Sequence, residues 1–334
     1  MLTANELQTV CVGFVGALLL ALLTVTIEIL VSSRAYGLRR RRGALLSTAA
    51  LADCLKLLSK SPTKHGPQRA LAVVAVLLPA VLLVGGLPAG SGMGGLAITM
   101  ALEDRLLGLA AVLSAAPLAL FAYAATTTPL RRLPLSTVSI TLVGSCAVLV
   151  LCIAAVILSG DVRLDIDARS LRDWPLWRHP AGGLAFLGAL VILSSGLRIA
   201  FGGTGGGRLA PGLADGPGVN TVLLYLSRPL SVGGVSALAA HLYLGLDLGL
   251  DLGLDLGLDP SPYMGLDMSL APGSAGLIWA CVALCIGLVA ILQAAIADAD
   301  AEGLSRLLWG RLVPLAGFDL VWSCLRVGGV LPWS

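Results

Sequence analysis

Residues 137–159 read TVSITLVGSCAVLVLCIAAVILS, a run without a single charged side chain. A helix needs about 20 mostly apolar residues to cross the hydrocarbon core of a bilayer, so this run is long enough for one span. The rest of the chain has the same character: 57% of its residues are hydrophobic, 12% are charged and the mean hydropathy is +0.92. A soluble domain carries roughly 25% charged residues. The composition therefore predicts an integral membrane protein.

Seven further apolar runs of similar length flank this one. Together they predict an all-α, polytopic membrane protein with about eight transmembrane helices, folded as a single integral membrane domain over residues 1–334. The predicted spans are residues 10–30, 71–88, 106–126, 137–159, 181–201, 219–244, 274–297 and 308–331.

Basic residues are distributed unevenly between the two sides of these spans. The odd-numbered loops hold 15 lysines and arginines, nine of them in residues 31–70, whereas the even-numbered loops hold five. Cytoplasmic loops carry an excess of lysine and arginine. The pattern predicts a multi-pass protein of the cell membrane with cytoplasmic basic loops and both termini outside.

The first cytoplasmic loop contains a segment, residues 45–59, that is mostly apolar. Asp53, Lys56 and Lys60 interrupt it at spacings of three and four, which places them on one helical face. This pattern predicts an amphipathic helix in the membrane interface. Such a helix could roof a site for a lipid-like molecule or serve as a plain surface anchor.

The outer loop over residues 244–273 is acidic and of low complexity. It repeats the tetrapeptide L-G-L-D and has no basic residue; its first carboxylates are Asp247, Asp251, Asp255 and Asp259. A solvated linker is the favoured interpretation, and divalent-ion binding is the alternative. No other metal site is predicted.

Ionisable residues inside predicted spans are candidates for function, because an unpaired charge is costly in hydrocarbon. Arg228 and Asp319 are the central intramembrane candidates, and Asp319 could pair with Arg228 or carry a proton. Glu28 and Arg326 lie near span ends, where snorkelling to the interface is the alternative. The seven cysteines include no C-x-x-C pair and no iron–sulfur spacing, so we expect no redox centre in this chain.

Several motifs resemble those of one membrane-arm component of the proton-pumping NADH–quinone oxidoreductase, respiratory complex I, and of its homologue in membrane-bound hydrogenases. The first loop and second span carry most of the resemblance, and weaker matches follow near the sixth span. The matching pieces are R-R-G at 41–43, L-A-D-x-x-K-L-L at 51–58, P-A at 79–80, P-A-G at 88–90, G-V-N-T at 218–221 and Arg198.

The resemblance implies a membrane-arm component that helps to form the quinone-access chamber, where the membrane arm meets the peripheral iron–sulfur arm. Quinone would be the substrate of the whole complex. NAD, FMN and iron–sulfur clusters would belong to partner subunits, and this chain would hold no cofactor and no catalytic residue of its own. The residues implied at the chamber mouth and docking face are Glu28, Arg41, Arg42, Asp53, Lys56, Arg198 and Asp215.

The chain departs from the family pattern at its carboxylates. Positions where the family has glutamates hold Thr141, Ser195 and Val222, and only Glu28 lies near the family acid that follows the first span. In the family these carboxylates line the quinone chamber and couple it to proton movement. Hydroxyl and isopropyl groups cannot carry protons near neutral pH in their place.

Two alternatives to a complex I component therefore stand. One is the matching membrane component of a membrane-bound hydrogenase, which the short spacing from Gly43 to Asp53 favours. The other is a scaffold or transporter without redox coupling, which the missing carboxylates favour.

Overall fold

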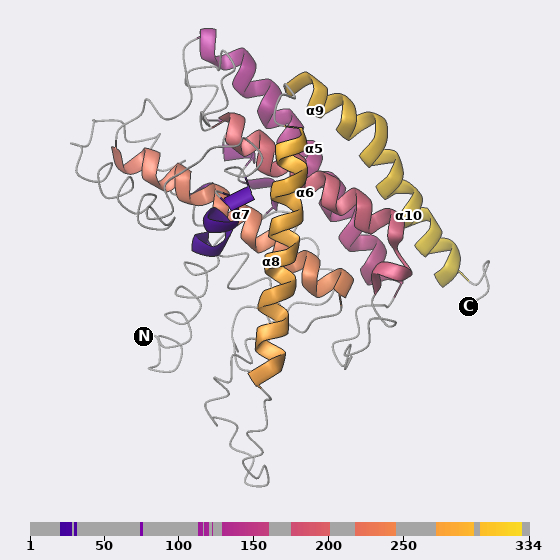
Figure 1. The fold of residues 1–334 in the computed structure, drawn as a ribbon. Helices are drawn as coiled ribbons and strands as arrows, with labels where there is room; N and C mark the ends of the chain where they lie inside the picture. The colour runs from indigo at the N-terminus through magenta and orange to yellow at the C-terminus, as the bar shows by residue number, and fades with distance from the viewer. Residues whose placement is uncertain are drawn as a thin grey trace, which may run out of the picture.

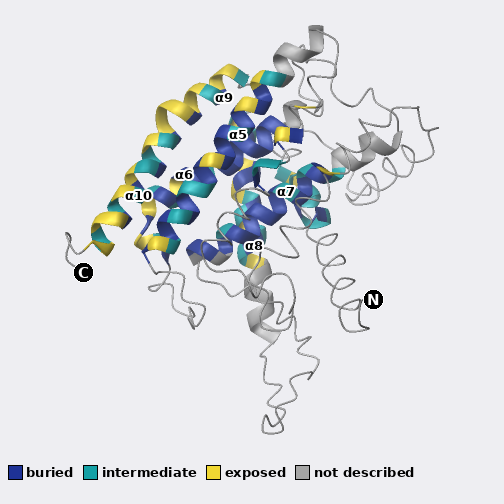
Figure 2. Ribbon diagram, turned by 180° about the vertical axis from the view of Figure 1, so that it is seen from behind, coloured by how far each residue is buried: buried dark blue, intermediate teal, exposed yellow. Residues whose placement is uncertain are grey.

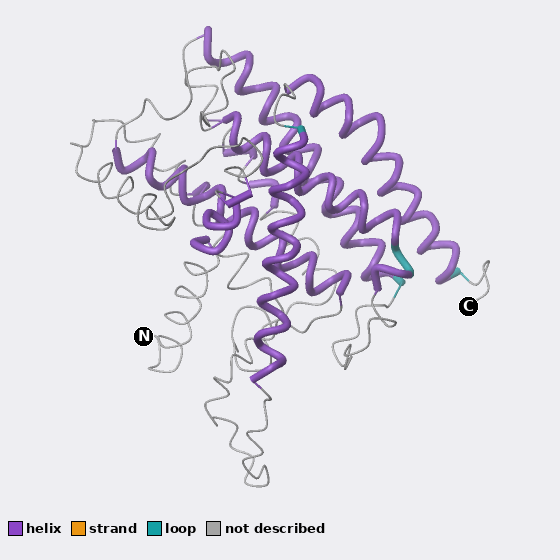
Figure 3. The backbone as a smooth tube through the Cα atoms, in the orientation of Figure 1, coloured by secondary structure: helices purple, strands orange, loops and turns teal. Residues whose placement is uncertain are grey.

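The computed structural model describes residues 21–28, 30–31, 74–75, 113–115, 117–119, 122, 129–159, 175–200, 218–244, 272–296 and 301–328. These residues are helical, with short turns, and no strand occurs among them (Figure 3). The all-α prediction is confirmed for this part of the chain. The predicted amphipathic segment and the acidic repeat lie outside it.

Five long helical segments make up most of this structure (Figure 1). Each overlaps one of the predicted apolar runs. The helix that contains the run 137–159 begins eight residues before it, at Pro129. The elements are α5 (Pro129–Leu158), α6 (Pro180–Ala200), α7 (Gly218–Leu244), α8 (Pro272–Ala295), and a continuous segment of α9 (Ala301–Leu307), η5 (Leu308–Leu312) and α10 (Val313–Val327). A single 3-10 turn, η3 (Pro175–Trp177), precedes α6.

The last segment begins at Ala301, seven residues before the predicted start of the eighth span. The extension carries Glu302 and Arg306, whose side chains form an exposed ion pair at 2.6 Å across one helical turn. Hydropathy does not detect such a turn because it is polar, but charge pairs four residues apart support helix.

Two of the described helices are long and apolar enough to cross a membrane, over Ser136–Leu158 and Pro180–Leu197, and a shorter apolar helix covers Ala280–Ala295. For α5 and α6 the described structure thus agrees with the predicted fourth and fifth spans in length and composition. The eight-span arrangement as a whole stays a prediction.

The main core lies between α5, α6 and the α9–α10 segment, which run side by side (Figure 1). Leucines on the α9–α10 segment fill positions where α5 and α6 carry glycine. A Cβ atom at Gly144 would lie 2.6 Å from Leu308, and one at Gly188 would lie 2.7 Å from Leu312. Glycine at both positions lets the helices approach closely, as small residues do in membrane bundles.

A second apolar cluster joins residues 21–28 to α7 and α8. Its buried members are Ala21, Leu230, Ala237, Ala240, Val282 and Ile286. The helix at residues 21–28 therefore packs on α7, and this contact positions Glu28 for the ion pair described below.

The turn η5 has π-helical geometry, in which the Val313 amide donates to the Leu308 carbonyl. Pro314 follows at once and has no amide proton to donate, and its ring would collide with the carbonyl four residues back. The wider π turn removes that conflict. After it, a buried stripe continues through Ala316, Asp319 and Ser323 toward α5 and α6.

Candidate functional site

The first polar site joins the helix at residues 21–28 to α7. An Arg228 Nη2–H group donates to Glu28 Oε1 at 2.8 Å, and the two side chains are 22% and 13% exposed. Arg228 Nε has no hydrogen-bond partner among the described residues. Both charged side chains are mostly buried, and each stabilises the other because either charge would be costly to bury alone.

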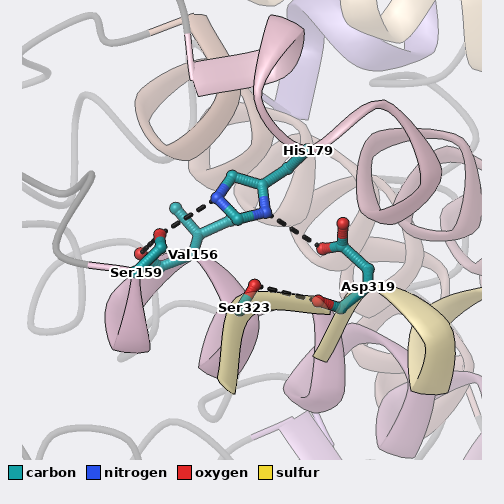
Figure 4. Close-up of polar contacts among 5 residues, drawn as sticks. All are labelled: Val156, Ser159, His179, Asp319 and Ser323. Atoms are coloured by element: carbon teal, nitrogen blue, oxygen red, sulfur yellow. Dashed lines mark hydrogen bonds and ion pairs between the residues drawn. The ribbon is translucent and has the colours of Figure 1, made fainter. Parts of the chain in front are cut away.

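The second polar site is a chain of three buried side chains: Ser159 at the end of α5, His179 directly before α6, and Asp319 in α10 (Figure 4). Ser159 Oγ lies 3.0 Å from His179 Nε2, and His179 Nδ1 lies 3.2 Å from Asp319 Oδ2. Their exposed fractions are 5%, 0% and 2%. The imidazole thus bridges a hydroxyl and a carboxyl group inside the main bundle.

The local sequence fixes the position of His179. The turn η3 precedes it, and the His179 amide donates to the Pro175 carbonyl at 3.0 Å. Pro180 opens α6, where proline fits because the first helical amide needs no partner. The His179 carbonyl then accepts the Gly183 amide at 2.9 Å as the first helical bond. The imidazole is therefore held on a rigid helix start.

Backbone contacts also hold the two partners of His179. The Ser159 hydroxyl donates to the Val156 carbonyl of its own helix at 2.7 Å. The Asp319 carbonyl accepts the Ser323 hydroxyl at 2.9 Å, one turn further along α10 (Figure 4). A serine that bonds back to its own helix is satisfied without water.

A close helix approach brings Asp319 to α6. A Cβ atom at residue 182 would collide with Asp319 Oδ2 and would lie 3.3 Å from the Tyr243 hydroxyl. Glycine at this position therefore leaves the space that the carboxyl group occupies. The Tyr243 hydroxyl, from the end of α7, also faces Cys152 of α5, and the Tyr243 ring packs edge-to-face on Phe186 with the ring centroids 5.4 Å apart.

The structure separates the two central intramembrane candidates. Arg228 pairs with Glu28, and Asp319 pairs with His179, so the suggested contact between Arg228 and Asp319 does not form. Of the residues expected at the chamber mouth, Glu28 is described in full. Arg198 lies in α6 with an undescribed side chain, and Arg41, Arg42, Asp53, Lys56 and Asp215 lie outside the described residues.

Sequence reasoning missed His179 and Ser159. Both fall at the edges of apolar runs, where polar residues look like ordinary interface groups. The available clue was a histidine immediately before a proline that opens an apolar run, since such a side chain is carried at a helix start. The partner of His179 in α10, Asp319, is 140 residues away, so spacing along the chain does not predict the contact.

Thr141 and Ser195, which stand where the family has glutamates, are buried in the described structure. The Thr141 hydroxyl donates to the Thr137 carbonyl of its own helix at 2.9 Å. The buried Ser195 hydroxyl has no partner among the described residues. Neither hydroxyl contacts the acids of the two polar sites in any described hydrogen bond. Val222 lies in α7, and its side chain is not described.

No three histidine, cysteine, aspartate or glutamate side chains in the described ranges converge as a metal-binding group. The acidic repeat lies outside these ranges. A scan of protein-family models finds no match to this chain, and a sequence search of curated proteins finds no match either.

Proposed function

We propose that this protein is a polytopic subunit of the cell membrane, with about eight spans, that forms part of the membrane arm of an NADH–quinone oxidoreductase. Quinone would enter a chamber near the cytoplasmic end of the first span. Peripheral iron–sulfur subunits would supply the electrons from NAD and FMN. This chain contributes shape and buried charge, and its partners contribute the redox centres.

The polarity of α10 supports the membrane part of this proposal. Its buried stripe includes Asp319 and Ser323, whereas Phe318, Val321 and Leu325 are 60%, 58% and 39% exposed. Figure 2 shows exposed positions, in yellow, repeated along the α9–α10 segment. Polar groups inside and apolar groups outside suit a helix surrounded by lipid and are unfavourable in water. Trp322 lies under the Arg326 guanidinium at 5.6 Å, as in the interfacial belts of membrane proteins.

The observation that supports the quinone-chamber part most strongly is the ion pair of Glu28 with Arg228. Glu28 is the acid nearest in sequence to the family carboxylate that follows the first span. The ion pair holds it, mostly buried, against α7, the helix that begins with the G-V-N-T motif. An acid held at this place could shape the entry of a polar quinone headgroup.

Co-purification from native membranes tests the assignment. A tagged full-length chain should recover peripheral iron–sulfur subunits, and isolation of the chain alone would contradict a complex I role. The Lys56→Ala and Arg42→Ala exchanges should weaken that recovery, with Arg306→Ala as a control on an exposed cation far along the chain. Recovery of a nickel–iron protein would favour the hydrogenase alternative.

One set of observations favours a second candidate, a scaffold or transporter without redox coupling. Thr141 and Ser195 hold hydroxyl groups where the family has carboxylates, and Thr141 bonds to its own helix backbone. Under this alternative the chain would purify without iron–sulfur partners yet keep both buried polar sites. The same co-purification therefore separates the two candidates.

A further inference from the structure

The hydrogen bonds around His179 define where its protons lie. The Val156 carbonyl has no proton, so the contact of 2.7 Å to Ser159 uses the only hydroxyl proton that serine has. Ser159 Oγ must then accept from His179 at 3.0 Å, which places a proton on Nε2. The remaining contact, between Nδ1 and Asp319 Oδ2 at 3.2 Å, still needs one proton between its two atoms.

We infer that His179 and Asp319 form a buried proton-binding site, loaded with one proton that the imidazole and the carboxyl group share. The proton can lie on Oδ2, beside a neutral imidazole, or on Nδ1, as an imidazolium beside a carboxylate. Transfer between these forms breaks one O–H bond and makes one N–H bond, and the pair keeps zero net charge. The site requires no quinone and no redox partner.

Burial explains why the loaded form is favoured. Loss of the shared proton would leave a carboxylate facing an imidazole lone pair with a net negative charge, and the side chains are at most 3% exposed. An uncompensated buried charge is strongly unfavourable. The other titratable groups that face Asp319 are Cys152 of α5 and Tyr243 of α7, and neither is a cation. Arg178, next to His179 in the chain, is exposed.

Tyr243 lies on the carboxyl side of the pair. Its hydroxyl lies over the same glycine as Asp319 Oδ2 and also faces Cys152 of α5. Ser159 closes the other side of the imidazole.

The same three residue types form the catalytic triad of serine hydrolases, and the structure argues against that use here. A nucleophilic serine gives its proton to the histidine and must reach a substrate. Ser159 instead donates to its own helix backbone and is 5% exposed. In a triad, moreover, Nε2 would accept the serine proton and would carry none itself.

Nitrogen-15 solid-state NMR of the full-length chain in lipid vesicles tests the site. The chain has three histidines, so exchange of His65 and His241 for glutamine leaves His179 as the only labelled imidazole. The wild-type site should show a protonated Nε2 at every pH from about 6 to 8, the range in which a free histidine titrates. Nδ1 should stay in a hydrogen bond to Asp319 over the same range.

The Asp319→Asn exchange keeps the shape of the side chain but cannot share the proton. His179 in this variant should be a neutral imidazole at pH 8 that shares no proton through Nδ1, and its Nδ1 resonance should differ from that of the wild-type chain. Glu302→Gln, which removes an exposed carboxylate from the same helical segment, should leave the His179 spectrum unchanged. If the asparagine variant fails to fold, the wild-type Nδ1 resonance decides the question, because an Nδ1 lone pair without a hydrogen bond would show that the pair shares no proton.

Three results would overturn the inference. One is an unprotonated Nε2 in the wild-type chain, and another is an unchanged His179 spectrum in the Asp319→Asn variant. The third is covalent labelling of Ser159 by a fluorophosphonate probe, which would establish a hydrolase-type nucleophile. Since the spectra require no iron–sulfur partner, they can succeed or fail independently of the co-purification result.

Discussion

Asp319 contacts His179 across 140 residues of sequence, with Oδ2 and Nδ1 3.2 Å apart. The contact joins the middle of α10 to the start of α6 inside a core of leucine, alanine and valine side chains. It is therefore both a structural link between the last helix and the bundle and the centre of the proposed proton site.

Removal of His179 should destabilise the bundle strongly. The His179→Ala exchange leaves the Asp319 carboxyl group buried without its partner, which costs about 3–5 kcal/mol for a charged group. Asp319→Leu in the same chain should recover part of this loss, because no acid then remains unpaired. Unfolding in detergent, followed by circular dichroism, gives the double-mutant cycle, in which pairs in contact couple by about 0.5–3 kcal/mol. Strict additivity would exclude the contact.

Substitution of Gly182 in α6 should disturb the contact of His179 with Asp319, because Gly182 lies against the Asp319 carboxyl group. A methyl group there would overlap Asp319 Oδ2, whereas one at Gly317 or Gly310 would meet no atom within 4 Å. We expect Gly182→Ala to lower the thermal midpoint of unfolding and to alter the His179 resonances. Gly317→Ala serves as the matched control and should do neither. Equal behaviour of the two variants would contradict the close approach of α6 and α10.

The ion pair of Glu28 with Arg228 should depend on opposite charge rather than on either residue alone. Glu28→Arg places two cations together and should destabilise the chain, and so should Arg228→Glu, which pairs two acids. The double exchange restores opposite charges and should regain a large part of the lost stability. A double variant that is as unstable as the sum of the single variants would show that the helix at residues 21–28 does not pack on α7 as described.

The helices were predictable from the sequence to the extent that hydropathy determines them. The run at 181–201 coincides with α6, and the run at 137–159 coincides with the apolar part of α5, which begins earlier, at Pro129. Hydropathy finds these stretches because a long apolar stretch forms a helix and is buried. Hydropathy missed the turn at Ala301–Leu307, since its charged pair stabilises helix without apolar character. The π turn at Leu308–Leu312 could not be predicted from hydropathy, because it depends on how the helix backbone accommodates Pro314.

The candidate sites were less predictable. Asp319, Arg228 and Glu28 stood out because charge is rare inside apolar runs, but their partners depend on which helix faces meet. For Asp319 the contact depends on Gly182, and the packing of the last helical segment on α5 and α6 depends on Gly144 and Gly188, which permit close approach without any marker in local spacing. His179 and Ser159 escaped notice for the same reason: each looks ordinary in its own segment.

The central claim, that this is a membrane bundle with its polar groups turned inward, can be tested most directly on α10. Nitroxide labels would be placed singly at Phe318, Val321 and Leu325 in a cysteine-free chain in lipid vesicles, with a label at the exposed, polar position Arg306 as the control. Oxygen, which partitions into lipid, should relax the three α10 labels more strongly than a water-soluble nickel chelate, and the order should reverse at Arg306. Stronger relaxation by the nickel chelate at the three α10 positions would contradict a lipid-facing helix and the membrane assignment with it.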